Sequence, residues 1–435
     1  MLDLNLIRTN QTAVEAALRK RMDHVDLSPL VANDAKRREL VTAVERLKAR
    51  RNQVSAEIPV LKKAGDNVDG LLAEMKEVSA TIKSMDGDIR VLDEAIRDEL
   101  ARLPNLPADD VAAGGKEANE VLRSWGDKPS FAFDPIDHVS LVTSLGLVDY
   151  ERGVKMGGNG FWLYRGVGSR LEWALLNYFI DTHLADGYEF VLPPHLLTYQ
   201  CGFTAGQFPK FEDDVFQLRS DDQSPGDAFT QFILPTAETA LINFHRDEIL
   251  SEEELPRKYF AYTPCYRKEA GSYRAQERGM IRGHQFNKVE MFQFTTPETS
   301  DAALDELIAK AEALVQGLGL HYRVSKLAAG DASAAMAKTY DIEVWIPSMG
   351  EYKEVSSASN AVDYQSRRGN IRFRRGDRQI EYVHSLNASG LATSRILPAI
   401  VEQGQQSDGS VALPRVLAER LGVERLMPEP TVVRS

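Results

Sequence analysis

Hydrophobic side chains recur at alternating intervals of four and three residues in two stretches near the N-terminus. The first comprises Leu40, Val44, Leu47, Arg51, Val54, Ile58 and Leu61, with Arg51 as the polar exception. The second comprises Met75, Val78, Ile82, Met85, Ile89, Leu92 and Ile96. The segment between them, residues 65–70, has the composition of a turn. The pattern predicts an antiparallel coiled-coil hairpin over about residues 36–103, with each helix roughly 42 Å long. Pro59 should kink the first helix or shift its end.

From about residue 120 the pattern becomes mixed. After the Leu103-Pro104-Asn105-Leu106-Pro107 linker, helical spacing begins near Ser169, and Gly187 ends that helix before a short strand. Further helices are predicted at 236–248, 301–317 and 389–403. Strands are predicted at 258–264, 286–294, 341–346, 351–355, 371–374 and 380–384. This order predicts an α+β fold with an antiparallel sheet flanked by helices.

Composition narrows the class of protein. The chain has 435 residues, 43% of them hydrophobic and 27% charged, as in ordinary globular domains. No apolar run is long enough to cross a membrane. Cys201 and Cys265 are the only cysteines, too few for a disulfide framework or a four-cysteine zinc site, so we expect no zinc, packing roles for both, and a cytoplasmic location. Neither a Walker A loop nor a Gly-x-Gly-x-x-Gly motif is present, which argues against a P-loop or Rossmann nucleotide site.

The charge of the first hairpin helix contrasts with that of the whole protein. Residues 36–63 carry nine basic and three acidic side chains, a net charge of +6 in a protein of −12. A basic helix on an acidic protein favours a phosphate backbone as its partner. The candidate phosphate-binding residues are Arg46, Arg50 and Lys62.

The most informative chemistry lies in a predicted β-hairpin. Its first strand ends in Arg267-Lys268-Glu269, a loop with Arg274, Arg278 and Gly279 follows, and Arg282 precedes the second strand. Side chains two residues apart lie on the same face of a strand. Phe286, Lys288 and Glu290 are therefore expected to share one face. Such a face can hold a triphosphate, stack a purine and bind an ammonium group. Arg267 is the candidate for a substrate carboxylate and α-phosphate, because arginine bonds bidentately and keeps its charge.

This hairpin resembles motif 2 of the class II aminoacyl-tRNA synthetases, most closely the seryl-tRNA synthetases. Gly187-Tyr188 with Pro193-Pro194 resembles motif 1, which in that family builds the homodimer interface. Thr236-Ala237-Glu238 resembles the serine-binding loop, and Glu354-Val355-Ser356-Ser357 the metal and ATP segment. Asn387 to Arg395 resembles motif 3. The matches run in family order to about residue 428, and the N-terminal arm separates seryl enzymes from other class II synthetases.

The resemblance implies a tRNA-binding domain at residues 1–108 and a class II catalytic domain at 109–430. The expected reaction joins serine to ATP as seryl-adenylate and transfers the seryl group to the 3′ end of tRNA(Ser), and by family also tRNA(Sec). Implied partners are serine, ATP and a second copy of the chain, with Mg²⁺ as cofactor and no membrane.

The resemblance also assigns site residues. The expected catalytic residues are Arg267, Glu269 and Arg395. Serine is expected at Thr236, Ala237, Glu238, Arg267, Glu290 and Ser389. ATP is expected at Arg267, Lys268, Glu269, Arg282, Phe286, Glu354, Val355, Ser356, Ser357 and Arg395. Mg²⁺ is expected at Glu354 and Ser357. The side-chain hydroxyl groups of Thr236 and Ser389 could also cap helices. A single histidine in such a strand is more often structural than catalytic, so His284 is expected to be structural.

Several positions depart from the family pattern, namely Lys268, Gly283, Ala388 and the Gln403-Gly404 pair. None of them removes a group with an assigned role. Three alternatives remain open at this point: a paralogue that supplies activated serine or seryl-tRNA to a biosynthetic pathway, an amino acid:carrier-protein ligase, and a non-catalytic RNA-binding paralogue. The arm argues against the carrier-protein ligase, and the intact charged residues argue against a non-catalytic protein.

Overall fold

The computed structural model describes residues 1–219, 229–269, 279–376 and 378–429. The chain divides into two compact units, residues 2–104 and residues 105–435 together with Met1. Within the described ranges, no helix is both long and apolar enough to cross a membrane.

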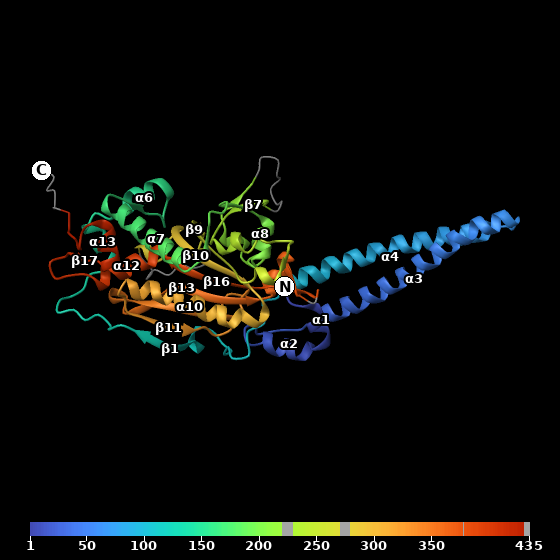
Figure 1. Ribbon diagram of the computed structural model, residues 1–435, viewed down its shortest axis with the longest axis horizontal. Helices are drawn as coiled ribbons and strands as arrows, with labels where there is room; N and C mark the ends of the chain where they lie inside the picture. The colour runs from blue at the N-terminus through green and yellow to red at the C-terminus, as the bar shows by residue number, and fades with distance from the viewer. Residues whose placement is uncertain (220–228, 270–278, 377, 430–435) are drawn as a thin grey trace. The chain divides into compact units, whose positions relative to one another are not determined.

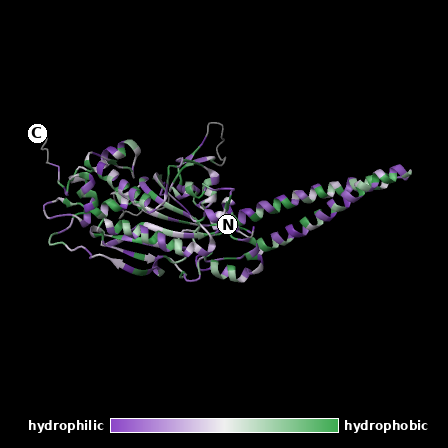
Figure 2. Ribbon diagram, in the orientation of Figure 1, coloured by the Kyte–Doolittle hydropathy of each residue, from purple (hydrophilic) through white to green (hydrophobic). Residues whose placement is uncertain are grey.

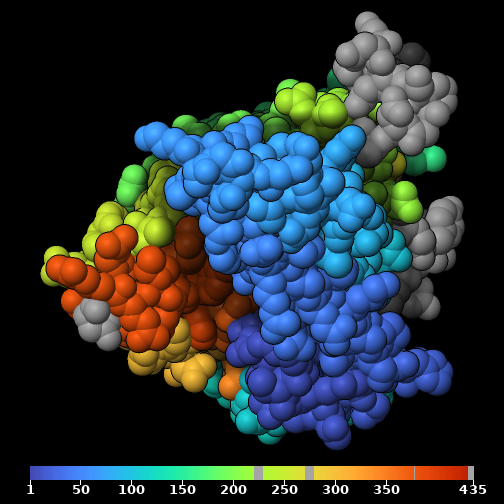
Figure 3. All heavy atoms as spheres, turned by 90° about the vertical axis from the view of Figure 1, so that its right-hand side faces the viewer, coloured from blue at the N-terminus to red at the C-terminus, as the bar shows by residue number. Residues whose placement is uncertain are grey.

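The N-terminal unit is helical. Two short helices, α1 (Leu4–Thr9) and α2 (Gln11–Leu18), precede the long pair α3 (Ser28–Ala64) and α4 (Asp69–Arg102), which form the predicted hairpin. Hydrophobic and hydrophilic residues alternate along both long helices (Figure 2), and the seam between them buries residues of the predicted pattern, including Val44, Val54 and Ile82. In the space-filling view of Figure 3 the atoms of this N-terminal unit are coloured blue. The coiled-coil prediction is therefore confirmed.

The first hairpin helix begins at Ser28, earlier than the predicted start near residue 36. Helix α3 continues through Pro59 to Ala64, so Pro59 does not end it. Gly65 then adopts a left-handed conformation (φ +85°), and its N–H donates to the carbonyls of Leu61 and Lys62. Glycine suits this position because it lacks the Cβ that disfavours positive φ.

The second unit is built on an eight-stranded sheet (Figure 1). The strand order is β1 (Glu120–Trp125), β11 (Tyr322–Lys326), β12 (Lys338–Ile346), β13 (Glu351–Val362), β16 (His384–Ala392), β10 (Gln285–Thr295), β9 (Arg257–Tyr266) and β4 (Glu189–Val191). Every neighbouring pair is antiparallel except β4 and β9. The predicted α+β class with a mainly antiparallel sheet is confirmed.

Three helices pack on this sheet and complete the core. They are α7 (Val167–Ala185), α10 (Ser300–Gly317) and α12 (Thr393–Gln403). Helix α10 lies against β13 and β16, and its apolar face enters the same hydrophobic cluster as α7 and α12. The shorter helices are α5 (His138–Ser144), α6 (Tyr150–Gly157), α8 (Tyr199–Thr204), α9 (Glu238–Leu241), α11 (Tyr364–Gly369) and α13 (Arg415–Leu421).

Four small sheets lie beside the main one. Two of them have three strands, in the orders β5 (Leu196–Thr198), β7 (Gln231–Ile233), β6 (Gln217–Leu218) and β15 (Ile380–Tyr382), β14 (Arg372–Arg374), β8 (Ile249–Ser251). The other two have two strands each, β2 (Val148–Asp149) with β3 (Leu163–Tyr164) and β17 (Val411–Ala412) with β18 (Arg425–Leu426).

Two predicted helices were wrong in extent. The helix expected at 236–248 is only the four-residue α9 followed by turns. The helix expected at 389–403 begins at Thr393, and Ser389 instead lies on β16, so a helix-capping role for Ser389 is excluded. In the second segment tertiary pairing overrides the local pattern, because β16 is held between β13 and β10 in the centre of the sheet.

Candidate active site

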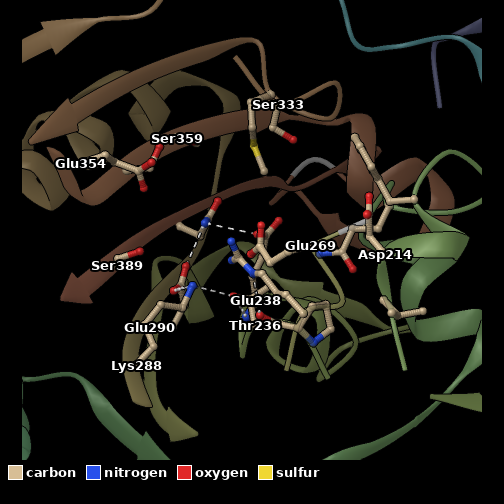
Figure 4. A pocket seen from close by; sticks show the side chains of 18 of the residues that line it. Asp214, Thr236, Glu238, Glu269, Lys288, Glu290, Ser333, Glu354, Ser359 and Ser389 are labelled. Carbon is tan, nitrogen blue, oxygen red and sulfur yellow. Dashed lines mark hydrogen bonds and ion pairs between the residues drawn. The ribbon is translucent and has the colours of Figure 1, made fainter. Parts of the chain in front are cut away.

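A cavity of about 530 Å³ opens over the central strands (Figure 4). Strands β10, β13 and β16 contribute to its wall, together with the loop after β9 and with Pro235, Thr236 and Glu238. Charged side chains of both signs line it: Asp214, Glu238, Arg267, Glu269, Arg282, Lys288, Glu290 and Glu354. Its uncharged polar lining includes Gln207, Thr236, Ser333, Ser357, Ser359, Asn387 and Ser389.

A narrower cavity of about 50 Å³ adjoins it and is lined by Phe286, Val355 and Arg395. Six residues border both spaces: Arg267, Glu269, Arg282, Lys288, Glu354 and Ser389. Arg395 is fixed by its own bonds to the backbone, since its Nη1 donates to the Glu354 carbonyl at 2.9 Å and its Nε to the Ile281 carbonyl at 3.2 Å. The two cavities therefore form one continuous site.

Strand β10 supplies the polar floor of the site. The period of two predicted for Phe286, Lys288 and Glu290 is observed, since all three line the joined cavities. The Lys288 ammonium donates to Thr236 Oγ1 at 2.7 Å and forms an ion pair with Glu290 Oε2. Glu290 is 0% exposed, and its other oxygen accepts from Asn387 Nδ2 at 2.9 Å. These interactions hold a buried carboxylate in one orientation.

Glu238 lies in the same pocket and is held by a neighbouring glutamine. Its Oε1 accepts from Gln365 Nε2 at 2.8 Å. Burial, and next the negative charge of Glu290, raise the pKa of Glu238 to about 7. The carboxyl groups of Glu238 and Glu290 thus lie in the same cavity, and the pKa of Glu238 lies near neutral pH.

The loop after β9 carries the predicted motif 2 residues beyond the end of the strand, which stops at Tyr266. The expectation that Arg267 and Glu269 share a strand face was therefore wrong, and Glu269 has a positive φ of 51°. Arg267 nevertheless faces the site: its Nε donates to the Pro235 carbonyl at 3.3 Å, and its guanidinium lies 5.2 Å from the centre of the Phe286 ring. Glu269 forms an ion pair with Arg282 at 2.6 Å.

At the far side of the site, Glu354 and Ser357 face a further carboxylate that sequence reasoning missed. Ser357 Oγ donates to Asp341 Oδ1 at 2.7 Å. Burial, and next the charge of Glu354, raise the pKa of the Asp341 carboxyl well above its usual range. In the part of the chain that the structure describes, no group of three or more His, Cys, Asp or Glu residues forms a metal centre by itself. Any ion here would need further oxygen ligands from a substrate.

Some predicted residues do not border the cavities. Ala237 is fully buried in a neighbouring hydrophobic cluster, Lys268 is exposed, and the Ser356 hydroxyl donates to the Ser389 carbonyl at 2.6 Å. Arg46, Arg50 and Lys62 lie exposed on α3 of the other unit, where Arg50 Nε is 3.2 Å from Glu74 Oε1. Arg274 and Arg278 lie outside the described residues.

Other sequence expectations meet direct observations. His284 occupies a structural position, with Nδ1 2.9 Å from the Arg267 carbonyl, and Cys265 is buried. The unusual Gly283 has a reason here, because a Cβ at that position would lie 2.1 Å from the Trp162 ring. Asn387 belongs to the motif 3 segment but was assigned no role there. In a strand, Asn387 and Ser389 lie on the same face because they are two residues apart. A strand prediction for this segment would therefore have placed Asn387 in the site together with Ser389.

Comparisons with known proteins identify both units. Residues 1–107 match the Seryl-tRNA synthetase N-terminal domain, and residues 226–404 match the tRNA synthetase class II core domain (G, H, P, S and T). "Serine--tRNA ligase 2" of Clostridium acetobutylicum is 60% identical over 98% of this chain and all of its own length. "Serine--tRNA ligase" of Syntrophobacter fumaroxidans is 45% identical over 98% of this chain and all of its own.

Solved structures agree. The structure of seryl-tRNA synthetase from Pyrococcus horikoshii complexed with ATP superposes with a TM-score of 0.92 at 34% identity, covering 99% of this chain and 100% of that one. The cytoplasmic serine-tRNA ligase from Naegleria fowleri in complex with AMP superposes with a TM-score of 0.84 at 28% identity, covering 99% of both chains.

Proposed function

This chain belongs to the seryl-tRNA synthetase family, and we propose that its two joined cavities form seryl-adenylate, which its other unit helps to deliver to tRNA(Ser). It is an aminoacyl-tRNA synthetase of the serine–tRNA ligase type. The observation that supports the proposed site is the wall that the two cavities share. Arg267 borders both the cavity with Glu238 and Glu290 and the cavity with Phe286 and Arg395. A serine carboxylate and an α-phosphate can therefore meet at one guanidinium.

The narrow cavity takes the adenine of ATP. Phe286 offers a ring face, and Arg395 offers a planar cation that its bonds to the backbone hold in place. Arg267 and Arg282 supply positive charge for the phosphates. Attack of the serine carboxylate on the α-phosphate brings two anionic groups together, and preorganised cations lower that barrier. The carboxylate nucleophile is already ionised, so no protein base is needed. Pyrophosphate leaves as the adenylate forms.

Serine occupies the larger cavity. The Glu290 carboxylate attracts the ammonium group or accepts from the hydroxyl, and Glu238, Thr236 and Ser389 complete a polar pocket. A pocket built to hydrogen-bond a hydroxyl rejects alanine strongly, because its polar groups are left without partners. Ser389 and Asn387 enter this pocket as neighbours on one face of β16.

The oxygen donors next to Arg395, whose Nη1 lies 3.3 Å from Glu354 Oε2, fit Mg²⁺. Glu354, Ser357 and Asp341 offer carboxylate and hydroxyl oxygens, the ligands that a hard cation prefers. Burial, and next the negative charge of Glu354, raise the pKa of the Asp341 carboxyl. With ATP bound, the ion would neutralise charge on the phosphates.

Helices α3 and α4 bind the tRNA. The support is the excess of basic side chains on α3, among them the exposed Arg46, Arg50 and Lys62, and the match of this unit to the seryl-specific N-terminal domain. Double-stranded RNA is recognised mainly through its shape and its phosphates. The domain boundary that we propose lies near residue 108. ATP and tRNA as substrates favour the cytoplasm as the site of action.

The chain acts as a homodimer through α7 and β4. Strand β4 is at the edge of the main sheet, and large apolar side chains are exposed beside it: Val167, Trp173, Leu184, Phe190 and Leu192. Large apolar side chains exposed on elements that contact each other, as α7 and β4 do, are typical of an interface. Sedimentation of Trp173→Glu, which is expected to be monomeric, tests this. A dimeric variant would contradict it.

The function is tested by ATP–pyrophosphate exchange with each standard amino acid, followed by charging of total tRNA. Exchange should depend on serine, and charging should be confined to serine acceptors. Exchange with another amino acid, or seryl transfer to a carrier protein in place of tRNA, would contradict the proposal.

A further inference from the structure

One buried carboxylate has no part in the chemistry proposed above. Glu172 lies on α7 and is 3% exposed. Its Oε1 accepts from Asn287 Nδ2 at 2.7 Å and from Thr393 Oγ1 at 2.5 Å. The three residues belong to α7, β10 and α12, so one oxygen atom joins three elements of the core.

The two donors are neighbours of the residues assigned to ATP. Asn287 follows Phe286 on β10 and points to the opposite face of the sheet. Thr393 is two residues before Arg395 in the first turn of α12. A displacement of either donor therefore moves one side of the adenine cavity relative to the other.

Asn287 is also held through its other amide atom. The Tyr262 hydroxyl donates to Asn287 Oδ1 at 3.2 Å, and the Tyr262 ring packs 5.7 Å from Trp173, the residue after Glu172. Helix α7 therefore holds both ends of the Asn287 amide, directly through Glu172 and indirectly through Trp173.

The chemistry of Glu172 is costly for a purely structural role. Burial raises the pKa of its carboxyl, and the groups that act against this, Thr393, Asn287 and Tyr164, are all neutral. A buried carboxylate without a cation is unfavourable for folding, and an apolar side chain of similar size is often tolerated in its place.

We propose that Glu172 is a positioning residue through which α7 sets the spacing of Phe286 and Arg395 across the adenine cavity. The inference rests on the proposed function of that cavity. The serine pocket is held separately, by the bonds of Lys288 to Thr236 and Glu290. Loss of the Glu172 carboxylate should therefore affect ATP and spare serine.

The test compares Glu172→Met with Glu172→Gln in the full-length protein by serine-dependent ATP–pyrophosphate exchange. Methionine keeps the length of the side chain but accepts no strong hydrogen bond, whereas the glutamine carbonyl can still accept from both donors. Because misplacement by about 1 Å can cost about 100-fold, we expect kcat/KM for ATP to fall at least about tenfold in Glu172→Met. The KM for serine should change less than about twofold, and Glu172→Gln should restore most of the ATP dependence.

Glu402→Met is the matched control. Glu402 is a fully buried carboxylate at the other end of α12, where it accepts from Ser348 and lies 2.8 Å from His138 Nδ1. Its loss should lower the Tm without a selective effect on ATP. Unchanged ATP kinetics in Glu172→Met would overturn the proposal, and so would an equal loss for ATP and serine with a lowered Tm. A wild-type protein without serine-dependent exchange would instead overturn the proposed function.

Discussion

The sharpest prediction concerns the replacement of Glu290 by glutamine. The change preserves shape and removes the negative charge from a side chain that is fully buried in the serine pocket. Asn387 Nδ2 can still donate to the new carbonyl, but the new amide group faces the Lys288 ammonium, a donor opposite a donor. The ammonium group of the substrate also loses the negatively charged partner that Glu290 provides.

The magnitude follows from the hydrogen bonds of this side chain. A hydrogen bond to a charged group contributes about 1.5–3 kcal/mol, and about 1.4 kcal/mol corresponds to a tenfold change. The KM for serine should therefore rise about 10- to 100-fold in pyrophosphate exchange. The KM for ATP should stay within about twofold, because Phe286 and Arg395, the residues that we propose for adenine, lie in the neighbouring cavity.

Folding must be measured alongside, because the change leaves a buried ammonium without its carboxylate. Breaking such a pair costs about 3–5 kcal/mol. Adding Lys288→Met to Glu290→Gln should recover stability without recovering serine affinity. Glu269→Gln, which breaks the pair with Arg282 on the ATP side, is the mirror control and should raise the KM for ATP. The reasoning is refuted if Glu290→Gln raises the KM for ATP and leaves that for serine unchanged.

Four further predictions concern pH, metal and tRNA. The pKa of Glu238 is raised to about 7 in the folded protein, so its contribution to stability is complete below the unfolded pKa near 4.5 and is lost as pH rises to 7. By linkage, the replacement Glu238→Gln should remove roughly 3 kcal/mol of this pH dependence from the free energy of unfolding. Identical dependence of stability on pH in the variant and the wild type would contradict the raised pKa. Glu354→Ala should abolish Mg²⁺-dependent adenylation with an unchanged Tm and dimer, and a dimerisation defect would instead indicate a structural role. Deletion of residues 36–103 should leave pyrophosphate exchange intact and strongly reduce charging, and full charging by the deletion variant would refute a tRNA-binding arm. Charge reversal on α3, tested at Arg46, Arg50 and Lys62, should flatten the salt dependence of tRNA binding by roughly 0.7–0.9 log units for each phosphate that is no longer neutralised.

Elements with a strong internal period were predicted well. The arm helices, α10 and the strands β9, β10, β12 and β14 follow patterns that each segment carries alone, whereas β11 was not predicted and β13 extends to Val362, beyond its predicted end at residue 355. The wrong predictions of secondary structure lie where contacts with other elements determine the backbone conformation. Residues 242–248 form turns and not the predicted helix. Ser389 belongs to a strand, because the central position of β16 satisfies its backbone on both sides. Glu269 leaves the strand geometry and instead pairs with Arg282.

The sequence by itself determined the fold class, the hairpin arm and most of the charged residues that line the site, because periodicity and local motifs reside in consecutive residues. Only the tertiary structure decided how these residues act on one another. Asn387 and Glu290 are 97 positions apart, and sheet pairing brings them within 2.9 Å. The pKa of Glu238 depends on burial and on the charge of Glu290, and the role of Glu172 depends on its hydrogen bonds to two other elements. Such properties arise from distance and desolvation between separate segments, which only the packed chain defines.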